Sequence, residues 1–166
     1  MKNPKIDLDK IIIEPFPEKP SKIWDHEPRE LFYDYRLFAF FNSEKIGHLT
    51  ISVLHSLGDL RKRNDFWFDL SKKPQVIRPV VVFQGTEPPY RGQGVSGRLI
   101  IMANVLSKAK FQQPLSSDTT FCGNSFYDAN GQYYCERSAK RVWEKLEKEE
   151  LAKYCPYRGN PRWTMI

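Results

Sequence analysis

The residues with types and spacing best suited to chemistry form a short glycine-containing stretch, RGQGVS, from Arg91 to Ser96. A β-branched apolar run from Pro79 to Phe83 precedes it, and apolar residues at helical spacing follow it. This order predicts a strand, a glycine loop and a helix. Backbone N–H groups at a helix start point outward, and the helix dipole adds partial positive charge. With the full charge of Arg91 beside it, the loop is predicted to bind phosphate.

One pattern that fits this loop is the dinucleotide fingerprint G-x-G-x-x-G. Gly92, Gly94 and Gly97 match it, and Asp118 follows at about the spacing of a ribose-binding acid, ~20 residues. In dinucleotide folds, however, the first glycine follows the strand almost at once, whereas residues 87–91 intervene here. The chain beyond Asp118 is also too short for the remaining strands of a doubly wound sheet. Both observations disfavour a dinucleotide site.

A second pattern fits the loop together with the residues before it, PPYRGQGVS from Pro88 to Ser96. It resembles the R/Q-x-x-G-x-G/A loop of the GNAT superfamily of acyl-CoA-dependent N-acetyltransferases, with the P-x-Y-R that often leads into it. The order of elements and a later S-A-x-x-x-W-E-x-L stretch resemble the short phage and bacterial branch, so the resemblance covers about Leu31 to Ile166. Ser96 departs from the family's Gly or Ala, but its hydroxyl could cap the following helix.

The resemblance implies transfer of an acetyl group from acetyl-CoA, a co-substrate, to a primary amine. In the family the loop amides hold the CoA pyrophosphate, and a bulged strand before the loop bonds to the CoA arm. Gly85 interrupts the apolar run, as glycines at bulges often do. The cofactor-binding residues that the resemblance implies are Gly85, Thr86, Arg91, Gly92, Gln93, Gly94, Val95 and Ser96.

Acetyl transfer to an amine needs proton transfer, because the protonated amine must lose a proton before it attacks the thioester. Glu87 and Asp118, expected at the ends of two splayed strands, are our candidate bases. Many family members use a Tyr on a later helix to protonate the departing thiolate, but Trp143 stands there, and an indole cannot do so at physiological pH. Tyr133 and Tyr134 lie just before that helix, and we take Tyr134 as the candidate acid, with solvent as the alternative.

The fold that would position these residues is also implied by the resemblance. It is a mixed α/β, α+β-like GNAT fold with a twisted, mostly antiparallel sheet, splayed central strands and flanking helices. The sequence itself supports this order of elements. The expected elements are a hairpin over 31–54 turning at 43–45, a strand from 79, a helix to 110, a short strand at 115–118, a polar loop over 119–134, a helix over 136–146 and a final strand at 162–166.

Length and composition indicate how many domains the chain forms and where in the cell it is expected. A chain of 166 residues with 40% hydrophobic content suits a single GNAT-like domain, 1–166, whose residues 1–30 form an irregular Pro-rich N-terminal segment. No apolar run approaches the roughly 20 residues that cross a bilayer, and the N-terminus lacks the features of a signal peptide. We therefore expect a cytoplasmic protein with no membrane partner.

The spacing of the cysteines and histidines does not indicate a metal site or a disulfide framework. The three cysteines, Cys122, Cys135 and Cys155, are widely spaced and form no C-x-x-C. The histidines, His26, His48 and His55, are not at the spacing of a common metal site. We expect free thiols, structural or surface histidines, and no metal.

The formal charge of +6 and a pI near 9.2 favour an anionic partner. CoA is itself polyanionic and explains part of this bias. The remainder leaves open a catalytically inactive GNAT-fold binding protein for nucleic acid or acidic protein, and an acyltransferase acting on an amine carried on DNA or RNA. Arg61–Arg63 and Lys72–Lys73, near the aromatic stretch 66–68, are the residues that would serve such a partner.

Overall fold

The computed structural model describes residues 4–15, 19–20, 32–54, 79–117, 125–127, 133–155 and 162–166. The basic stretches within 55–78, the segment 21–31 and Asp118 lie outside the described residues, so their predicted roles stay predictions. Among the described residues, no helix is long and apolar enough to cross a membrane.

The elements follow the predicted order, with short additions. Along the chain they are η1 (Leu8–Lys10), β1 (Ile12–Pro15), β2 (Lys19–Pro20), β3 (Phe32–Phe41), β4 (Glu44–Leu54), β5 (Val80–Thr86), η3 (Pro88–Tyr90), α1 (Val95–Phe111), β6 (Ser116–Ser117), β7 (Ser125–Tyr127), β8 (Tyr133–Cys135), α2 (Glu136–Lys148), β9 (Ala152–Tyr154) and β10 (Trp163–Met165).

Strands β3 and β4 form the predicted antiparallel hairpin. Asn42 and Ser43 make its turn, both with positive φ, +50° and +65°. A two-residue turn of this hand matches the twist of the strands it joins. The turn therefore comes slightly earlier than the predicted 43–45, and it sets the register in which Leu37 pairs with Leu49.

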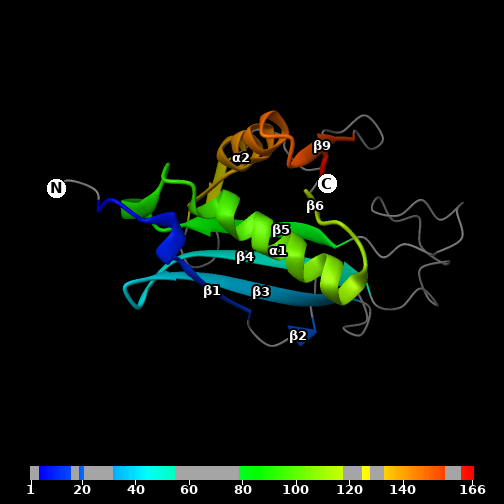
Figure 1. The fold of residues 1–166 in the computed structure, drawn as a ribbon, viewed down its shortest axis with the longest axis horizontal. Helices are drawn as coiled ribbons and strands as arrows, with labels where there is room; N and C mark the ends of the chain where they lie inside the picture. Colours follow the sequence, from blue (N-terminus) through cyan, green and yellow to red (C-terminus); the bar gives the residue numbers. More distant parts are fainter. Residues whose placement is uncertain are drawn as a thin grey trace, which may run out of the picture.

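The described strands form one large and one small sheet. The large sheet has eight strands in the order β1-β3-β4-β5-β6-β10-β9, with β2 paired to the edge of β3. Its pairs are antiparallel except for β5 and β6, which run parallel. Helix α1 lies across the face formed by β3, β4 and β5 (Figure 1). The predicted mixed α/β class with a mostly antiparallel sheet and two helices is confirmed.

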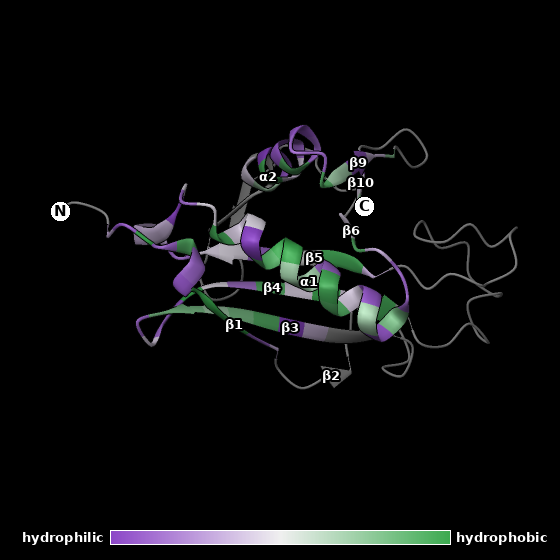
Figure 2. Cartoon of the chain, in the orientation of Figure 1, coloured by the Kyte–Doolittle hydropathy of each residue, from purple (hydrophilic) through white to green (hydrophobic). Residues whose placement is uncertain are grey.

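The core lies between α1 and that face of the sheet. Alternation puts one set of side chains from each strand against the helix. Figure 2 shows hydrophobic residues along the middle of α1 and hydrophilic ones over much of α2. The largest fully buried side chains of the core include Ile46, Leu49, Ile51, Leu99, Ile100, Leu115 and Trp143. Trp143 and Leu146 of α2 also belong to the core and are 1% and 2% exposed.

Two strand pairs differ from the sequence-based expectation. The stretch over 119–134, expected to be a loop, includes β7 and leads into β8, and these pair as a separate two-stranded sheet. Strand β9, which was not predicted, pairs with the expected final strand β10. Short strands such as these carry too few residues for a periodic pattern to appear in the sequence.

Candidate functional site

The glycine loop has the backbone geometry that an anion site needs. Gly92 and Gly94 have φ of +75° and +90°, a region that L side chains rarely adopt. Helix α1 starts immediately afterwards, and its first hydrogen bond runs from the Arg98 amide to the Gly94 carbonyl, 3.0 Å. The amides before Arg98 at the helix start therefore have no partner inside the helix. They are available to a negatively charged group at the positive end of the helix dipole.

Arg91 is held beside this loop. Its side chain is exposed, and its Nε donates a hydrogen bond to the Thr86 carbonyl at 3.1 Å. The bond anchors the guanidinium where β5 ends. Arg98, in the first turns of α1, adds a second exposed cation. A phosphate at the loop amides would thus lie next to two guanidinium groups, which suit phosphate oxygens well.

A hydroxyl pair joins the end of β5 to the start of α1. Thr86 Oγ1 and Ser96 Oγ lie 2.9 Å apart. The prediction that Ser96 caps the helix is wrong, because Gly94 occupies the N-cap position and Ser96 is the second helical residue. Both residues are half-buried, so the pair fixes the width of the gap between strand and helix.

The N-terminal segment also contacts the loop, which the sequence did not indicate. Gln93 Oε1 accepts a hydrogen bond from the Ile6 amide at 2.9 Å, and its Nε2 donates to the Pro4 carbonyl at 2.8 Å. Because both polar atoms of the Gln93 side chain are used in these bonds, only its backbone groups are available to a ligand. Leu8 lies close as well, since a Cβ on Gly94 would come within 3.3 Å of Leu8 Cδ1. The segment forms one wall of the loop.

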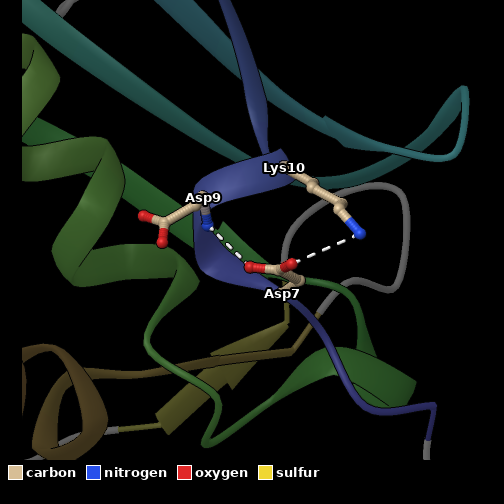
Figure 3. Close-up of polar contacts among 3 residues, drawn as sticks. All are labelled: Asp7, Asp9 and Lys10. Carbon is tan, nitrogen blue, oxygen red and sulfur yellow. Dashed lines mark hydrogen bonds and ion pairs between the residues drawn. The ribbon is translucent and has the colours of Figure 1, made fainter.

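The N-terminal segment that forms this wall also carries two carboxylates, Asp7 and Asp9 (Figure 3). Asp7 Oδ1 accepts from the Asp9 amide at 3.2 Å, and Asp7 Oδ2 lies 3.5 Å from Lys10 Nζ. The Asp9 carboxylate points toward α1 and lies 3.9 Å from Arg98 Nη2. These exposed pairs are weak. An anionic ligand at the loop would therefore compete with Asp9 for Arg98 at little cost.

Replacing Gln93 with alanine is expected to release the N-terminal segment from the loop. The Ile6 amide and the Pro4 carbonyl lose their partners, and each neutral hydrogen bond contributes about 0.5–1.5 kcal/mol. Hydrogen exchange at the Ile6 amide should speed up, while exchange at the Arg98 amide inside α1 should not. Equal Ile6 protection in the variant and the native protein would contradict this role of Gln93.

Tyr90 anchors the other side of the loop. This residue, the Tyr of P-x-Y-R, is 6% exposed, and its hydroxyl donates to Glu44 Oε2 at 2.5 Å. The hydrogen bond to Glu44, with burial and the nearby negative charge, raises the pKa of Tyr90 above its usual range. The two residues are 46 positions apart, so the contact was not visible in the sequence. It ties the loop to the start of β4.

Strand β5, which leads into this loop, pairs in parallel with β6. Within the described residues their parallel ladder has two pairs, Val80 with Ser116 and Val81 with Ser117. Strand β5 continues to Thr86 while still paired with β4 on its other side. The described part of β6 ends at Ser117, so the splay of these two strands stays a prediction. Buried hydrogen bonds hold the start of β6, including Leu115 N to Asn104 Oδ1 at 3.0 Å.

The bulge in β5 exists, but its predicted position at Gly85 is wrong. Thr50 pairs with Phe83 and Ile51 with Val81, so Val82 is the extra residue. Gly85 stays in regular register opposite His48. A Cβ on Gly85 would lie 2.6 Å from Cε1 and 3.1 Å from Nε2 of His48. Gly85 is thus required by close approach of an imidazole and not by a bulge.

The three candidate catalytic residues remain predictions. Glu87 directly follows β5, is half-buried, and donates its amide to the Ile46 carbonyl at 2.9 Å. Asp118 lies outside the described residues. Tyr134 lies in β8, of which the structure describes the backbone alone. No cluster of metal-ligating side chains occurs among the residues whose placement is described.

Two solved structures resemble this chain. An IAA acetyltransferase from Bacillus cereus ATCC 14579 aligns at 13% identity and a TM-score of 0.46, covering 93% of this chain and 98% of the other. A GNAT family acetyltransferase from Elizabethkingia anophelis, with acetyl-CoA bound, aligns at 15% identity and 0.48, covering 95% and 98%. By sequence, neither a family model nor a curated protein matches.

The structural match to GNAT family acetyltransferases thus extends over nearly the whole chain at low sequence identity. Among the described residues, the site consists of the loop 91–96, the end of β5 and the N-terminal wall around Leu8.

Proposed function

We propose that the protein is an acyl-CoA-dependent N-acetyltransferase that moves an acetyl group from acetyl-CoA to a primary amine of a small molecule or a protein. One observation carries the proposal: the left-handed Gly92 and Gly94 lead directly into α1, whose first turn contacts the end of β5. A diphosphate followed by an extended amide-containing arm is the kind of ligand that such an arrangement fits.

The residues present fit CoA at both ends of this surface. The amides of Gly94, Val95 and Ser96, with the Arg91 guanidinium, would hold the pyrophosphate. Backbone groups between Val82 and Thr86 would bond to the arm as an added strand does. Bound acetyl-CoA would supply an activated thioester carbonyl. An N–H group on the β5 edge could donate to its oxygen, and the fixed strand and loop would hold the reactants together.

Thermal unfolding with added ligand tests this proposal. Acetyl-CoA should raise the melting temperature, because a ligand that binds only the native state stabilises it, by about 2.7 kcal/mol at one hundred times its Kd. NAD, at the same concentration, should not. Stabilisation by NAD instead of acetyl-CoA would contradict the proposal and favour the dinucleotide alternative.

Thiol release then tests the reaction. The protein would be mixed with acetyl-CoA and each of spermidine, tyramine and a lysine-containing peptide, and free CoA thiol would be measured. We expect amine-dependent release with at least one acceptor. Binding of duplex DNA or RNA that falls steeply with salt, without any stabilisation by acetyl-CoA, would instead support the binding-protein alternative.

A further inference from the structure

His48 holds a position that the loop and the candidate acids do not explain. It lies in β4, half-buried, and pairs with Phe38 on one side and Gly85 on the other. The next position along the chain identifies its face. A Cβ on Gly47 would contact Val95 and Leu99 of α1, so Gly47 faces that helix. Because side chains alternate along a strand, His48 points to the opposite face of the sheet.

The His48 imidazole extends across β5. Its Cε1, Nε2 and Nδ1 atoms lie 2.6, 3.1 and 3.4 Å from where a Cβ of Gly85 would stand. Cε1 therefore overlaps the place of the missing side chain, and Nε2 lies tightly against it. Any residue other than glycine at position 85 would push the ring away. The imidazole of β4 therefore lies over the end of β5, the strand expected to bind the CoA arm.

The strand that carries His48 is more polar on this face than on the face against α1, although His48 pairs with Phe38 on β3. Thr50 and Ser52, which follow His48 on the same face, are 7% and 6% exposed. The charged residues on the elements around His48 are Asp34 and Arg36 on β3, Glu44 and Lys45 at the start of β4, and Glu87 just after β5. Lys45 Nζ lies 5.5 Å from the Phe38 ring centroid. Polar residues thus occupy three alternating positions of β4, and their side chains can hydrogen-bond to a polar group on this face.

We propose that His48 takes the proton from the acceptor amine, an assignment that rests on the proposed acetyl transfer. The neutral imidazole accepts one proton from the ammonium group. The amine nitrogen then forms a bond to the thioester carbonyl carbon while the carbon–sulfur bond breaks. The departing thiolate takes the second proton of the nitrogen, and the imidazolium returns its proton to solvent. The amine accordingly approaches from the face opposite α1, over Gly85.

Two variants separate this role from a structural one. His48→Gln should lower kcat about a hundredfold, which is the lower end of the range typical for loss of a general base. It should also remove the acidic limb of the kcat–pH profile. The Kd for acetyl-CoA should not change. Arg36→Gln is the matched control, because it also introduces Gln on the same face, one strand further from β5, and it should change neither kcat nor the profile. An unchanged kcat and acidic limb in His48→Gln would overturn the proposal.

The decisive readout does not require turnover. In a 13C–1H spectrum of histidine-labelled protein, the His48 signal is identified by its absence in His48→Gln. Acetyl-CoA should shift this signal, whereas adenosine 3′,5′-bisphosphate, which lacks the arm and thioester, should not. Gly85→Ala, which must displace the ring, should abolish the acetyl-CoA shift without affecting bisphosphate binding.

Calorimetry on the same samples separates the possible failures. If acetyl-CoA binds and the His48 signal moves no further than with the bisphosphate, the assignment of His48 is wrong while acetyl-CoA binding stands. If acetyl-CoA does not bind at all, the proposed function fails, and the role of His48 fails with it.

Discussion

Gly94→Ala is expected to weaken acetyl-CoA binding at least about tenfold and to lower the free energy of unfolding by about 1–2 kcal/mol. Gly94 has φ of +90°, and a Cβ there would also come within 3.3 Å of Leu8. Relief of this strain requires a rotation of the peptide groups that aim the first amides of α1. The binding loss should therefore exceed what the stability loss alone would cause. Calorimetry and urea unfolding on the same variant measure both quantities.

Gly97→Ala is the matched control for that substitution. It adds the same methyl group three residues later, in the first turn of α1, where no described atom lies within 4 Å of the new Cβ. Alanine in a helix is favoured over glycine by up to about 1 kcal/mol. Gly97→Ala should thus keep or raise stability and leave the affinity within about twofold. Equal binding losses in the two variants would contradict the proposed role of the left-handed loop.

Trp143→Ala is expected to lower the free energy of unfolding by about 3–5 kcal/mol. Trp143 is 1% exposed and is the largest fully buried side chain among the described residues. Its removal would leave a cavity between α2 and the core. For a domain whose total stability is typically about 5–15 kcal/mol, such a loss is large. Urea unfolding followed by circular dichroism measures it through the transition midpoint.

Glu144→Ala, at the neighbouring position of α2, is the control. Glu144 Oε1 lies 3.6 Å from Lys140 Nζ, and both side chains are more than 40% exposed. Pairs of this kind contribute about 0–1 kcal/mol. The Glu144 variant should therefore unfold within about 1 kcal/mol of the native protein. If Trp143→Ala unfolded at a urea midpoint similar to that of Glu144→Ala, the indole would not stabilise the core as its burial indicates.

Features determined by short-range sequence patterns were predicted well. The loop from Arg91 to Ser96, the helix behind it and the hairpin before it depend on glycine conformation, apolar spacing and alternation. Each of these properties is contained within a few consecutive residues. The inward face of α2 was predictable for the same reason, because Trp143 and Leu146 recur at helical spacing.

Features that depend on distant residues were missed or placed wrongly. The Gln93 contact with Ile6 spans 87 positions, and the Tyr90 contact with Glu44 spans 46. Gly85 was assigned to a bulge because a glycine within a strand has two common causes, a bulge or a close neighbour. The neighbour, His48, is identified only by the pairing of β4 with β5. Ser96 was predicted to cap the helix, but the left-handed Gly94 occupies the N-cap position.

Calorimetric titration of acetyl-CoA into the native protein and into Arg91→Glu tests the proposed function most directly. Arg91 is exposed beside the loop, and charged hydrogen bonds contribute about 1.5–3 kcal/mol, so charge reversal should weaken binding at least about tenfold. Lys108→Glu makes the same charge change about 20 Å further along α1 and should bind normally. Native affinity that Arg91→Glu alone loses is the predicted result. No binding to the native protein, or equal binding by all three proteins, would contradict it.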